Sequence, residues 1–285
     1  MNLDLKLLKD LYLINHISGE EYQMITYIIN YCYHIPNINI ELDHYNNLFI
    51  TKNTNNLGNY PCLIAHMDTV HNFNKPREII REGNLIYAKY INSNERCGLN
   101  ADDCNGIFII LNLLNELSDL KVCFTVEEEV GGVGADQALF NINFFKNVRY
   151  LIQPDRRGSS DLITVTNGYN ITSDEFLEDI NDLITKYSYK SEIGTFTDVG
   201  ILSPELGLSG INVSCGYYNE HTIKEICHID ELLNCYNFIK DIIIKLDNNK
   251  YYDIICNKVK FFDNFDSIPC DSCTDFDCLN CKKYI

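Results

Sequence analysis

The amino-acid sequence predicts a three-layer α/β/α sandwich built around a mixed, largely parallel central sheet. Strand-length apolar segments alternate with segments of helical periodicity, which supports this fold class. The strands also end on or just before His, Asp, Glu or Tyr, which is a signal of function. With 285 residues, of which 46% are hydrophobic, the chain has enough material for the core of one large domain or two small ones. In such a sheet, ligands bind beyond the carboxyl ends of the strands.

The predicted elements follow in chain order. A helix is expected at residues 18–35, where a capping serine precedes two glutamates and apolar residues recur at helical spacing. Apolar runs are expected as buried strands, and the periodic segments between and after them as helices. The strands are residues 61–68, 121–129, 148–155 and 210–218, and the helices are residues 103–117, 173–188 and 228–246. No internal repeat and no Pro/Gly/Ser-rich linker interrupts this order.

The composition disfavours several classes of function. The formal net charge is −17, and no basic patch is apparent in the sequence. Binding to nucleic acid or to an anionic membrane is therefore disfavoured, whereas cation binding agrees with the charge. The N-terminus lacks the continuous apolar run of a signal peptide, and no stretch approaches the roughly 20 apolar residues of a membrane span. We therefore expect a soluble, cytoplasmic protein whose 13 cysteines stay reduced.

Two pairs of ionisable residues stand at the ends of predicted elements. His66 and Asp68 are two residues apart, so they project to the same side of a strand, where the carboxylate can orient the imidazole for metal binding. Asp102 and Asp103 stand where the next helix begins. Each pair also has an ordinary structural explanation, which is a surface His–Asp pair in the first case and helix capping in the second.

Three consecutive glutamates, Glu127, Glu128 and Glu129, follow an apolar strand and precede the glycine-rich stretch "GGVG". Adjacent carboxylates repel one another, so the arrangement requires compensating positive charge. At a strand end, two neighbouring side chains can approach one centre from different angles. One carboxylate can then bind a dication while its uncoordinated neighbour accepts a proton from water. A simply solvated acidic loop is the alternative explanation.

Two further candidates follow later strands. Asp155 ends the strand at 148–155, and His221 follows the strand at 210–218. Taken alone, Asp155 is explained by pairing with Arg156 or Arg157, and His221 by an ordinary loop position. Taken together, two histidines and at least three acids at successive strand ends form an oxygen-rich site with two imidazoles. Such a site suits a pair of Zn²⁺ or similar ions.

The order and spacing of five segments resemble a known group of enzymes. The segments are "HMD", "NADDCNG", "TVEEEVGGVGA", "PDRRG" and "GYYNEHT", which extend from about His66 to Glu225. They resemble the co-catalytic di-zinc exopeptidase superfamily, which includes peptidase T and the glutamyl-aminopeptidase-like zinc aminopeptidases. Only about forty residues separate Asp155 from Asp198, too few for the lid and dimerisation domain of peptidase T. The resemblance therefore implies a compact catalytic domain with at most a minimal insertion built on the helix at 173–188.

The resemblance implies five metal ligands. One ion would be bound by His66 and Asp155, and the second by Glu129 and His221. Asp102 would bridge the two ions. A cis peptide would follow the bridging aspartate. The implied cofactors are two Zn²⁺, with Co²⁺ or Mn²⁺ as substitutes.

The resemblance also implies two catalytic residues that do not bind metal. Asp68 would orient His66, and Glu128 would be the general base. Glu127 aligns with an acidic position that has no known catalytic role. Thr197 and Asp198, in the segment "GTFTDVG", would lie near the site without contacting the ions.

The function implied by the resemblance is hydrolysis of peptide bonds by water that two metal ions activate. An aminopeptidase acting on short peptides is the favoured form of this activity. Alternatives on the same scaffold are a carboxypeptidase and a zinc-dependent deacylase acting on N-acyl amino acids. A non-catalytic metal-binding or assembly protein is the alternative of another class, and Glu128 argues against it because such a protein needs no general base. Large homo-oligomers occur among the relatives, but nothing in the sequence requires one.

A cysteine-rich tail at residues 263–285 follows the catalytic domain predicted at residues 1–262. Cys270, Cys273, Cys278 and Cys281 form two closely spaced pairs. Paired spacing of this kind suits a zinc knuckle that would hold a third, structural Zn²⁺. The loop between the pairs is far shorter than in zinc ribbons, so a tail whose thiols are paired by coincidence is the alternative.

Overall fold

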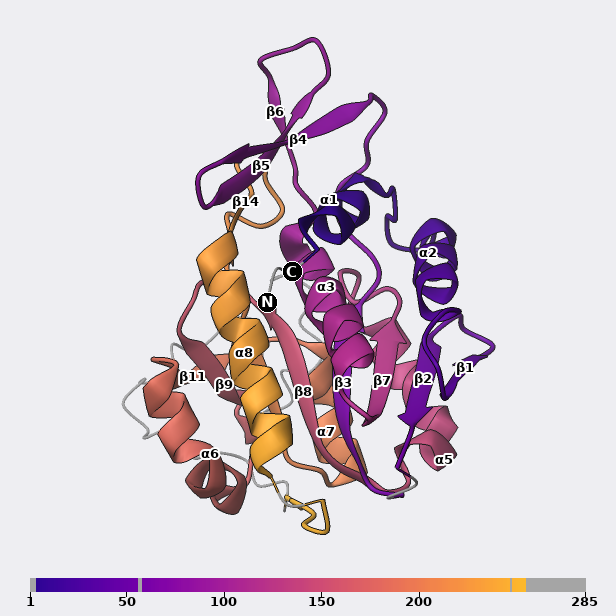
Figure 1. Ribbon diagram of the computed structural model, residues 1–285, viewed down its shortest axis with the longest axis vertical. Coiled ribbons are helices and arrows are strands. Elements are labelled where there is room, and N and C mark those ends of the chain that lie inside the picture. Colours follow the sequence, from indigo (N-terminus) through magenta and orange to yellow (C-terminus); the bar gives the residue numbers. More distant parts are fainter. Residues whose placement is uncertain (1–3, 56–57, 247, 255–285) are drawn as a thin grey trace, which may run out of the picture.

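Nine strands form the central sheet of this computed structural model, which describes residues 4–55, 58–246 and 248–254. The strands lie in the order β1-β2-β7-β3-β8-β12-β9-β10, and β11 pairs with β9 (Figure 1). Their bounds, in spatial order, are β1 (Ile38–Leu42), β2 (Leu48–Asn53), β7 (Asp119–Thr125), β3 (Tyr60–His66), β8 (Val148–Arg156), β12 (Gly210–Ser214), β9 (Asp161–Thr166), β10 (Tyr169–Asn170) and β11 (Lys190–Gly194). The α/β class predicted from the sequence is confirmed.

The four central strands, β7, β3, β8 and β12, run parallel to one another. On one side of β3, His66 is opposite Thr125 of β7, and on the other side Leu63 is opposite Ile152 of β8. Every residue of β3 is buried, which explains its apolar sequence. Because parallel strands end at the same edge of a sheet, side chains that end or follow these strands come close together. Antiparallel pairs formed by β2 and β9 flank the centre, so the sheet is mixed as predicted.

Helices cover both faces of the sheet, which gives the fold three layers (Figure 1). Alternate residues of β3 mark the two faces, since Leu63 and Ala65 belong to one buried apolar cluster and Cys62 and Ile64 to the other. The first cluster contains residues of α1 (Leu5–Leu13), α2 (Tyr22–Cys32), α3 (Ala101–Glu116), α6 (Asp174–Lys186) and α8 (Ile229–Lys245). The second contains residues of α4 (Val133–Ala138), the 3₁₀ turn η1 (Leu139–Asn141), α5 (Ile142–Phe145) and α7 (Asp198–Leu206).

A second, smaller sheet stands at the top of Figure 1 and was not expected from the sequence. Its strands are β13 (Tyr217–Tyr218), β14 (Ile226–His228), β5 (Leu85–Tyr90), β4 (Arg77–Glu82) and β6 (Arg96–Cys97). The antiparallel pair β4–β5 turns at Gly83, which has a positive φ of 62°. Because β14 pairs with β5, this sheet joins the segment after His66 to the segment that carries His221.

The predicted elements are present with small shifts at their ends. One predicted strand, residues 210–218, divides into β12 and β13, and Gly216 between them has a φ of 83°. The segment between Asp155 and Asp198 adds β9, β10 and β11 to the central sheet and places α6 beside α8, where Lys186 contacts Asp241 at 2.7 Å. This segment therefore extends the central sheet, and it builds no separate lid domain.

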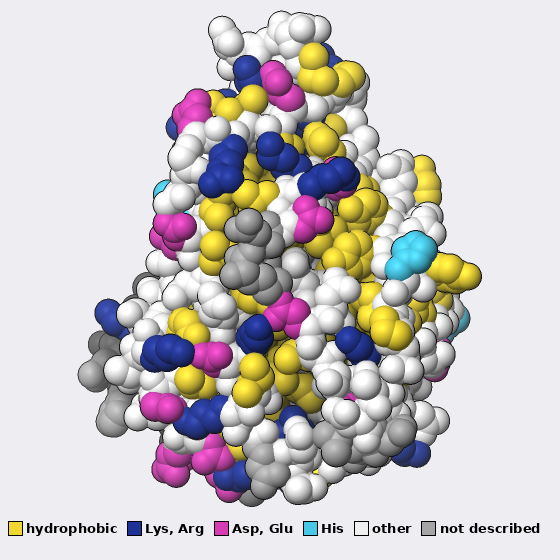
Figure 2. Space-filling view, viewed as in Figure 1, with side chains coloured by type: hydrophobic (Ala, Val, Ile, Leu, Met, Phe, Trp, Pro, Cys, Tyr) yellow, Lys and Arg dark blue, Asp and Glu magenta, His cyan; other side chains and the backbone are white. Residues whose placement is uncertain are grey.

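Two other expectations concern the surface and the tail. Both basic and acidic side chains lie on the face shown in Figure 2. Among the helices that the structure describes, none combines the length and the apolar character needed to cross a bilayer. The domain boundary predicted at residue 263 and the tail cysteines Cys270, Cys273, Cys278 and Cys281 lie outside the described residues.

A fully buried histidine, His16, holds the N-terminal segment against the end of β3. Its Nδ1 lies 2.8 Å from the Met67 carbonyl oxygen, and its Nε2 lies 3.3 Å from the Asn100 side-chain amide. These contacts fit a neutral imidazole that donates from Nδ1 and accepts at Nε2. Burial lowers the pKa of His16 to about 4, so the folded protein resists protonation of this ring.

We expect His16 to make the protein sensitive to mild acid. The unfolded chain takes up a proton near the ordinary pKa of 6.5, whereas the folded chain does so only near pH 4. Relative to His16→Asn, which keeps a donor for Met67, the wild type should lose about 3 kcal/mol of unfolding free energy as the pH falls through this window. Denaturant unfolding of both chelator-treated proteins at each pH measures the difference. Parallel stability curves would contradict the assignment.

Candidate metal centre

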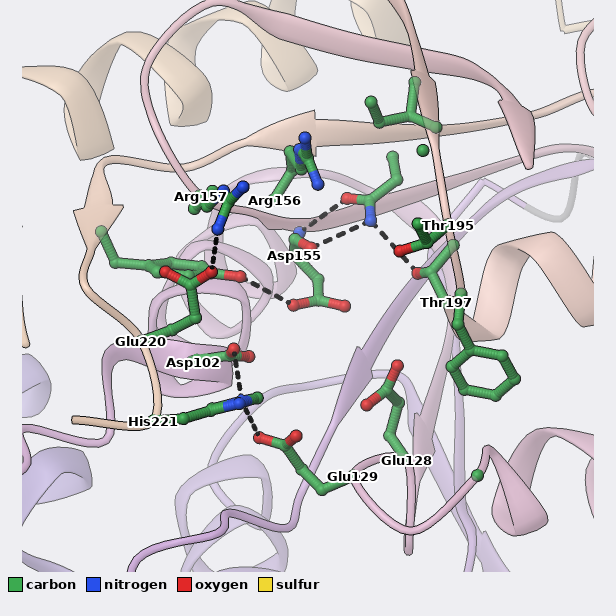
Figure 3. Close-up of a pocket in the computed structure, with 16 residues that line it drawn as sticks. Asp102, Glu128, Glu129, Asp155, Arg156, Arg157, Thr195, Thr197, Glu220 and His221 are labelled. Atoms are coloured by element: carbon green, nitrogen blue, oxygen red, sulfur yellow. Dashed lines mark hydrogen bonds and ion pairs between the residues drawn. The ribbon is translucent and has the colours of Figure 1, made fainter. Parts of the chain in front are cut away.

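The ionisable residues predicted from the sequence converge at the carboxyl edge of the central sheet. They come from the ends of β3, β7 and β8, the first turn of α3, and the loop between β13 and β14. The residues brought together are His66, Asp68, Asp102, Glu128, Glu129, Asp155 and His221. Figure 3 shows five of them, two aspartates, two glutamates and a histidine, around one pocket. The convergence follows from the parallel sheet, because residues distant in sequence occupy neighbouring strand ends.

The His66 imidazole is buried among three carboxylates. Its Nε2 lies 2.9 Å from Asp102 Oδ1 and 3.7 Å from Asp155 Oδ1, while its Nδ1 lies 3.2 Å from Asp68 Oδ1. Burial lowers the pKa of His66, but the three carboxylates outweigh burial and raise it well above its ordinary value. Asp68 thus contacts one ring nitrogen and leaves the other facing Asp102 and Asp155, which is the orientation that a metal ligand needs.

Asp68 also holds the turn that carries the glutamates. Its Oδ1 accepts the backbone N–H of Glu128 at 2.9 Å, and its Oδ2 accepts that of Glu129 at 3.1 Å. The Ser18 hydroxyl donates to Oδ2 at 2.7 Å. The chain turns at Glu127, which has a positive φ of 52°. Ser18 was not predicted as a site residue, because it lies fifty positions before Asp68 and only the tertiary fold brings it there.

Asp102 lies between the two histidines. Its Oδ1 is 2.9 Å from His66 Nε2, and its Oδ2 is 3.4 Å from His221 Nε2. His221 Nε2 also lies 2.9 Å from Glu129 Oε1. The peptide bond between Asp102 and Asp103 is cis, as the resemblance implied. One carboxylate therefore connects two half-sites, each of which contains an imidazole.

Asp155 is held by neutral donors. The Gln153 amide donates to its Oδ2 at 2.9 Å, and the buried Tyr217 hydroxyl donates to its Oδ1 at 3.3 Å. Gln153 also lies 3.4 Å from Asp198, which accepts the Thr125 hydroxyl at 2.6 Å. Gln153 was missed in the sequence because an amide inside a strand gives no signal. Tyr217 stands just before His221 and could have been found from that position.

The electrostatics of the site favour added positive charge. Burial, reinforced by neighbouring carboxylates, raises the pKa of Glu128 to about 10 and that of Asp155 to about 7. Hydrogen bonds to Asp102 and Glu129 raise the pKa of His221 to about 11. All these shifts reflect carboxylates gathered in a small volume. A divalent cation would offset their repulsion.

The donor atoms fit divalent ions. Donor atoms of His66, Asp102 and Glu129 lie within 4.8 Å of one another, and those of His66, Asp103 and Asp155 do so as well. Asp103 Oδ2 is buried and finds no hydrogen-bond partner among the described residues. Imidazole and carboxylate donors at this spacing suit Zn²⁺ or a similar ion. The sequence predicted Asp103 only as part of the helix start. The structure adds it to the group of candidate metal-binding residues.

A cavity of about 400 Å³ adjoins these residues. Acidic residues and His221 form one side, as Figure 3 shows, and other side chains complete the wall. The additional lining residues, which were not predicted as site residues, include Arg156, Arg157, Ile163, Thr195, Phe196 and Glu220. Thr197 also lines the cavity, as expected for a residue near the site. The volume is within the range of small-molecule sites, so the cavity is large enough for a short peptide.

No family model matches this sequence, and no curated protein matches it either. Solved structures match its fold. Aminopeptidase PepT from Bacillus cereus has a TM-score of 0.73 at 13% identity, over 85% of this chain and 97% of that chain. A tripeptidase from Staphylococcus aureus has a TM-score of 0.69 at 14% identity, over 84% and 96%. An aminopeptidase from the archaeon Desulfurococcus kamchatkensis has a TM-score of 0.65 at 16% identity, over 85% and 95%. The chain therefore has the fold of these peptidases, which confirms the fold that the sequence resemblance implied.

We expect Zn²⁺ to stabilise the folded protein. At a free concentration 100 times the dissociation constant, each site should add about 2.7 kcal/mol to the unfolding free energy, which raises the melting temperature. Asp102→Asn should abolish most of this shift. Asp241→Asn, which removes a partly exposed carboxylate that pairs with Lys186 and lies outside the donor clusters, should leave the shift unchanged. Melting curves of chelator-treated protein with and without Zn²⁺ measure it. Equal shifts in the two variants would contradict a site at Asp102.

Proposed function

We propose that this protein is a metal-dependent exopeptidase, specifically an aminopeptidase that hydrolyses short peptides. The observation that carries the proposal is the position of the Asp102 carboxylate, 2.9 Å from the imidazole of His66 and 3.4 Å from that of His221. A carboxylate shared by two imidazole-bearing half-sites is the donor arrangement that a pair of divalent ions needs. The fold, which is shared with known peptidases, supports the same function.

The proposed ligands divide into two half-sites that share Asp102. His66 and Asp155, 3.7 Å apart, would hold one ion, and Glu129 and His221, 2.9 Å apart, would hold the other. When bound, two ions of this kind supply electrostatic activation of water and of the scissile carbonyl group. Asp68 keeps the His66 ring in the required orientation. It also accepts the backbone N–H groups of Glu128 and Glu129, which holds these two residues in position.

Glu128 is proposed as the general base. Its side chain lines the pocket beside Asp102 and Asp155 (Figure 3), and Asp68 holds its backbone N–H. The Glu128 carboxylate takes a proton from the water that attacks the substrate carbonyl, and then delivers this proton to the leaving amine. The pKa of Glu128, about 10 without metal, would fall towards the neutral range in which a general base works if divalent ions occupied the neighbouring ligands.

The proposed ligand set favours a free α-amino group in the pocket. Glu129 and His221, 2.9 Å apart, would hold an ion that can take the neutral α-amine of a peptide as a further ligand. A carboxypeptidase or deacylase is the second candidate, because Arg156 and Arg157 line the same pocket and can bind a carboxylate. Both arginines already have acidic partners, Asp161 at 3.2 Å for Arg156 and Glu220 at 2.8 Å for Arg157. The aminopeptidase is therefore the better-supported function.

Adjacent glutamates offer a matched test of the general base. Glu128→Gln should lower kcat roughly 10²- to 10⁴-fold, because the variant lacks a group that accepts the proton. Glu127→Gln should change kcat little, since Glu127 instead accepts a hydrogen bond from Tyr45 at 2.5 Å. Peptide hydrolysis rates, together with metal content by mass spectrometry, compare the two variants. Equal losses of kcat at unchanged metal content would refute the role of Glu128.

The end of the substrate that the enzyme recognises can be tested directly. We expect a tripeptide with a free amino terminus to be cleaved, and its N-acetylated form to be cleaved at least tenfold more slowly, because an acetylated nitrogen is no longer a basic amine that can act as a metal ligand (a tenfold change is about 1.4 kcal/mol). Chromatography of the products identifies which bond is cut. Release of the C-terminal residue, or faster cleavage of the N-acetylated form, would favour the carboxypeptidase or deacylase.

A further inference from the structure

Glu225 is a fully buried acid in the loop that follows His221, and it has no role in the function proposed so far. Its carboxylate contacts a run of consecutive backbone N–H groups. Oε2 accepts those of Leu99 at 2.7 Å and Asn100 at 2.9 Å, and Oε1 accepts those of Ala101 at 2.7 Å and Asp102 at 3.2 Å. Four successive donors therefore converge on one side chain.

This arrangement is an anion-binding nest filled by the protein itself. Successive N–H groups point to one side because Asn100 has a left-handed backbone with a φ of 69°. A fifth donor, His71 Nε2, lies 3.1 Å from Oε2. A buried carboxylate is costly unless its oxygens accept hydrogen bonds, and here both oxygens do so. Gly98 is required beside it, since a Cβ there would lie 2.4 Å from the His71 ring.

The contacts of Glu225 join three segments of the metal centre. The nest includes the backbone N–H of Asp102, the proposed bridging ligand. His71 belongs to the segment that follows His66. Glu225 itself ends the turn that carries His221, in which the Glu225 N–H donates to the Thr222 carbonyl at 3.2 Å.

The His221 loop needs such an anchor. His221 has a left-handed φ of 60°, a backbone conformation that is uncommon for residues other than glycine. The Thr222 hydroxyl donates to the Asn219 carbonyl at 2.7 Å, which closes the turn on itself but does not attach it to the rest of the site. Apart from His221 itself, which lies 3.4 Å from Asp102, Glu225 links this turn to the first turn of α3.

We propose that Glu225 is a positioning residue that sets the separation of His221 from Asp102 and thereby determines the affinity for the metal ion at the His221 half-site. This inference rests on the proposed metal centre. It adds a residue that binds no ion and touches no substrate. Residues that orient metal ligands in this way typically change metal affinity roughly 10- to 100-fold when they are replaced.

Glu225→Gln is the sharpest substitution because it keeps the shape and removes the charge. One end of the amide would place N–H groups against two backbone donors, either those of Leu99 and Asn100 or those of Ala101 and Asp102. Two of the four backbone N–H groups would therefore lose their acceptor. Phe176→Leu is the control, since Phe176 is buried against Tyr150 and Tyr252, and its loss should destabilise the protein without disturbing the metal centre.

The test is isothermal titration calorimetry of Zn²⁺ into chelator-treated full-length protein. We expect Glu225→Gln to bind Zn²⁺ roughly 10- to 100-fold more weakly than the wild type at one of the binding steps that the wild type shows. His221→Ala identifies which step belongs to that half-site. Phe176→Leu should bind Zn²⁺ like the wild type even though it melts at a lower temperature. Equal Zn²⁺ affinities for Glu225→Gln and Phe176→Leu would overturn the inference and make Glu225 a purely structural residue.

The wild type and a second variant complete the test. Failure of the wild type to bind Zn²⁺ would overturn the proposed metal centre itself, and this inference with it. If Glu225→Gln does not fold, His71→Ala replaces it, because this variant removes one of the five donors and leaves the four backbone contacts. A smaller but measurable loss of Zn²⁺ affinity relative to Phe176→Leu is then expected, and no loss would overturn the inference.

Discussion

Negative charge buried at the carboxyl edge of the central sheet is the constraint on which the rest of this structure depends. Each buried carboxylate needs compensation within hydrogen-bond distance, and the protein provides it in different ways. Asp68 and Glu225 are compensated by backbone N–H groups, and Asp198 by a hydroxyl and an amide. Asp102 instead contacts the imidazoles of His66 and His221. The carboxylates with backbone donors organise the chain, whereas Asp102 and its neighbours are the ones suited to hold metal ions.

Segments that are distant in the sequence converge at this edge for different reasons. The parallel strands bring His66, the glutamates and Asp155 together without further help, because these residues end or follow adjacent strands. The remaining parts arrive from outside the central sheet. The N-terminal segment contributes Ser18, and the small sheet, by pairing β14 with β5, brings the His221 turn over the start of α3. The small sheet therefore supports the proposed metal centre as well as extending the fold.

Much of the site was predictable because the end of a buried strand can be recognised in a sequence. An apolar run that stops at His66, at the three glutamates or at Asp155 indicates both a buried strand and the edge where it ends. The supporting residues were not predictable in this way. Gln153 lies inside a strand, and Ser18 comes from the N-terminal segment, so neither stands at a position that the pattern marks.

The sequence by itself determined the order of the elements, the α/β class and the ionisable residues at the strand ends, because apolar periodicity and local breaks in it depend only on neighbouring residues. Tertiary structure alone decided which carboxylates contact imidazoles and which contact backbone. It made Glu225 the occupant of a nest formed by residues more than a hundred positions earlier, and it placed Asp103 in the donor cluster. Such contacts depend on distances between segments, and those distances are set only when the sheets and helices pack.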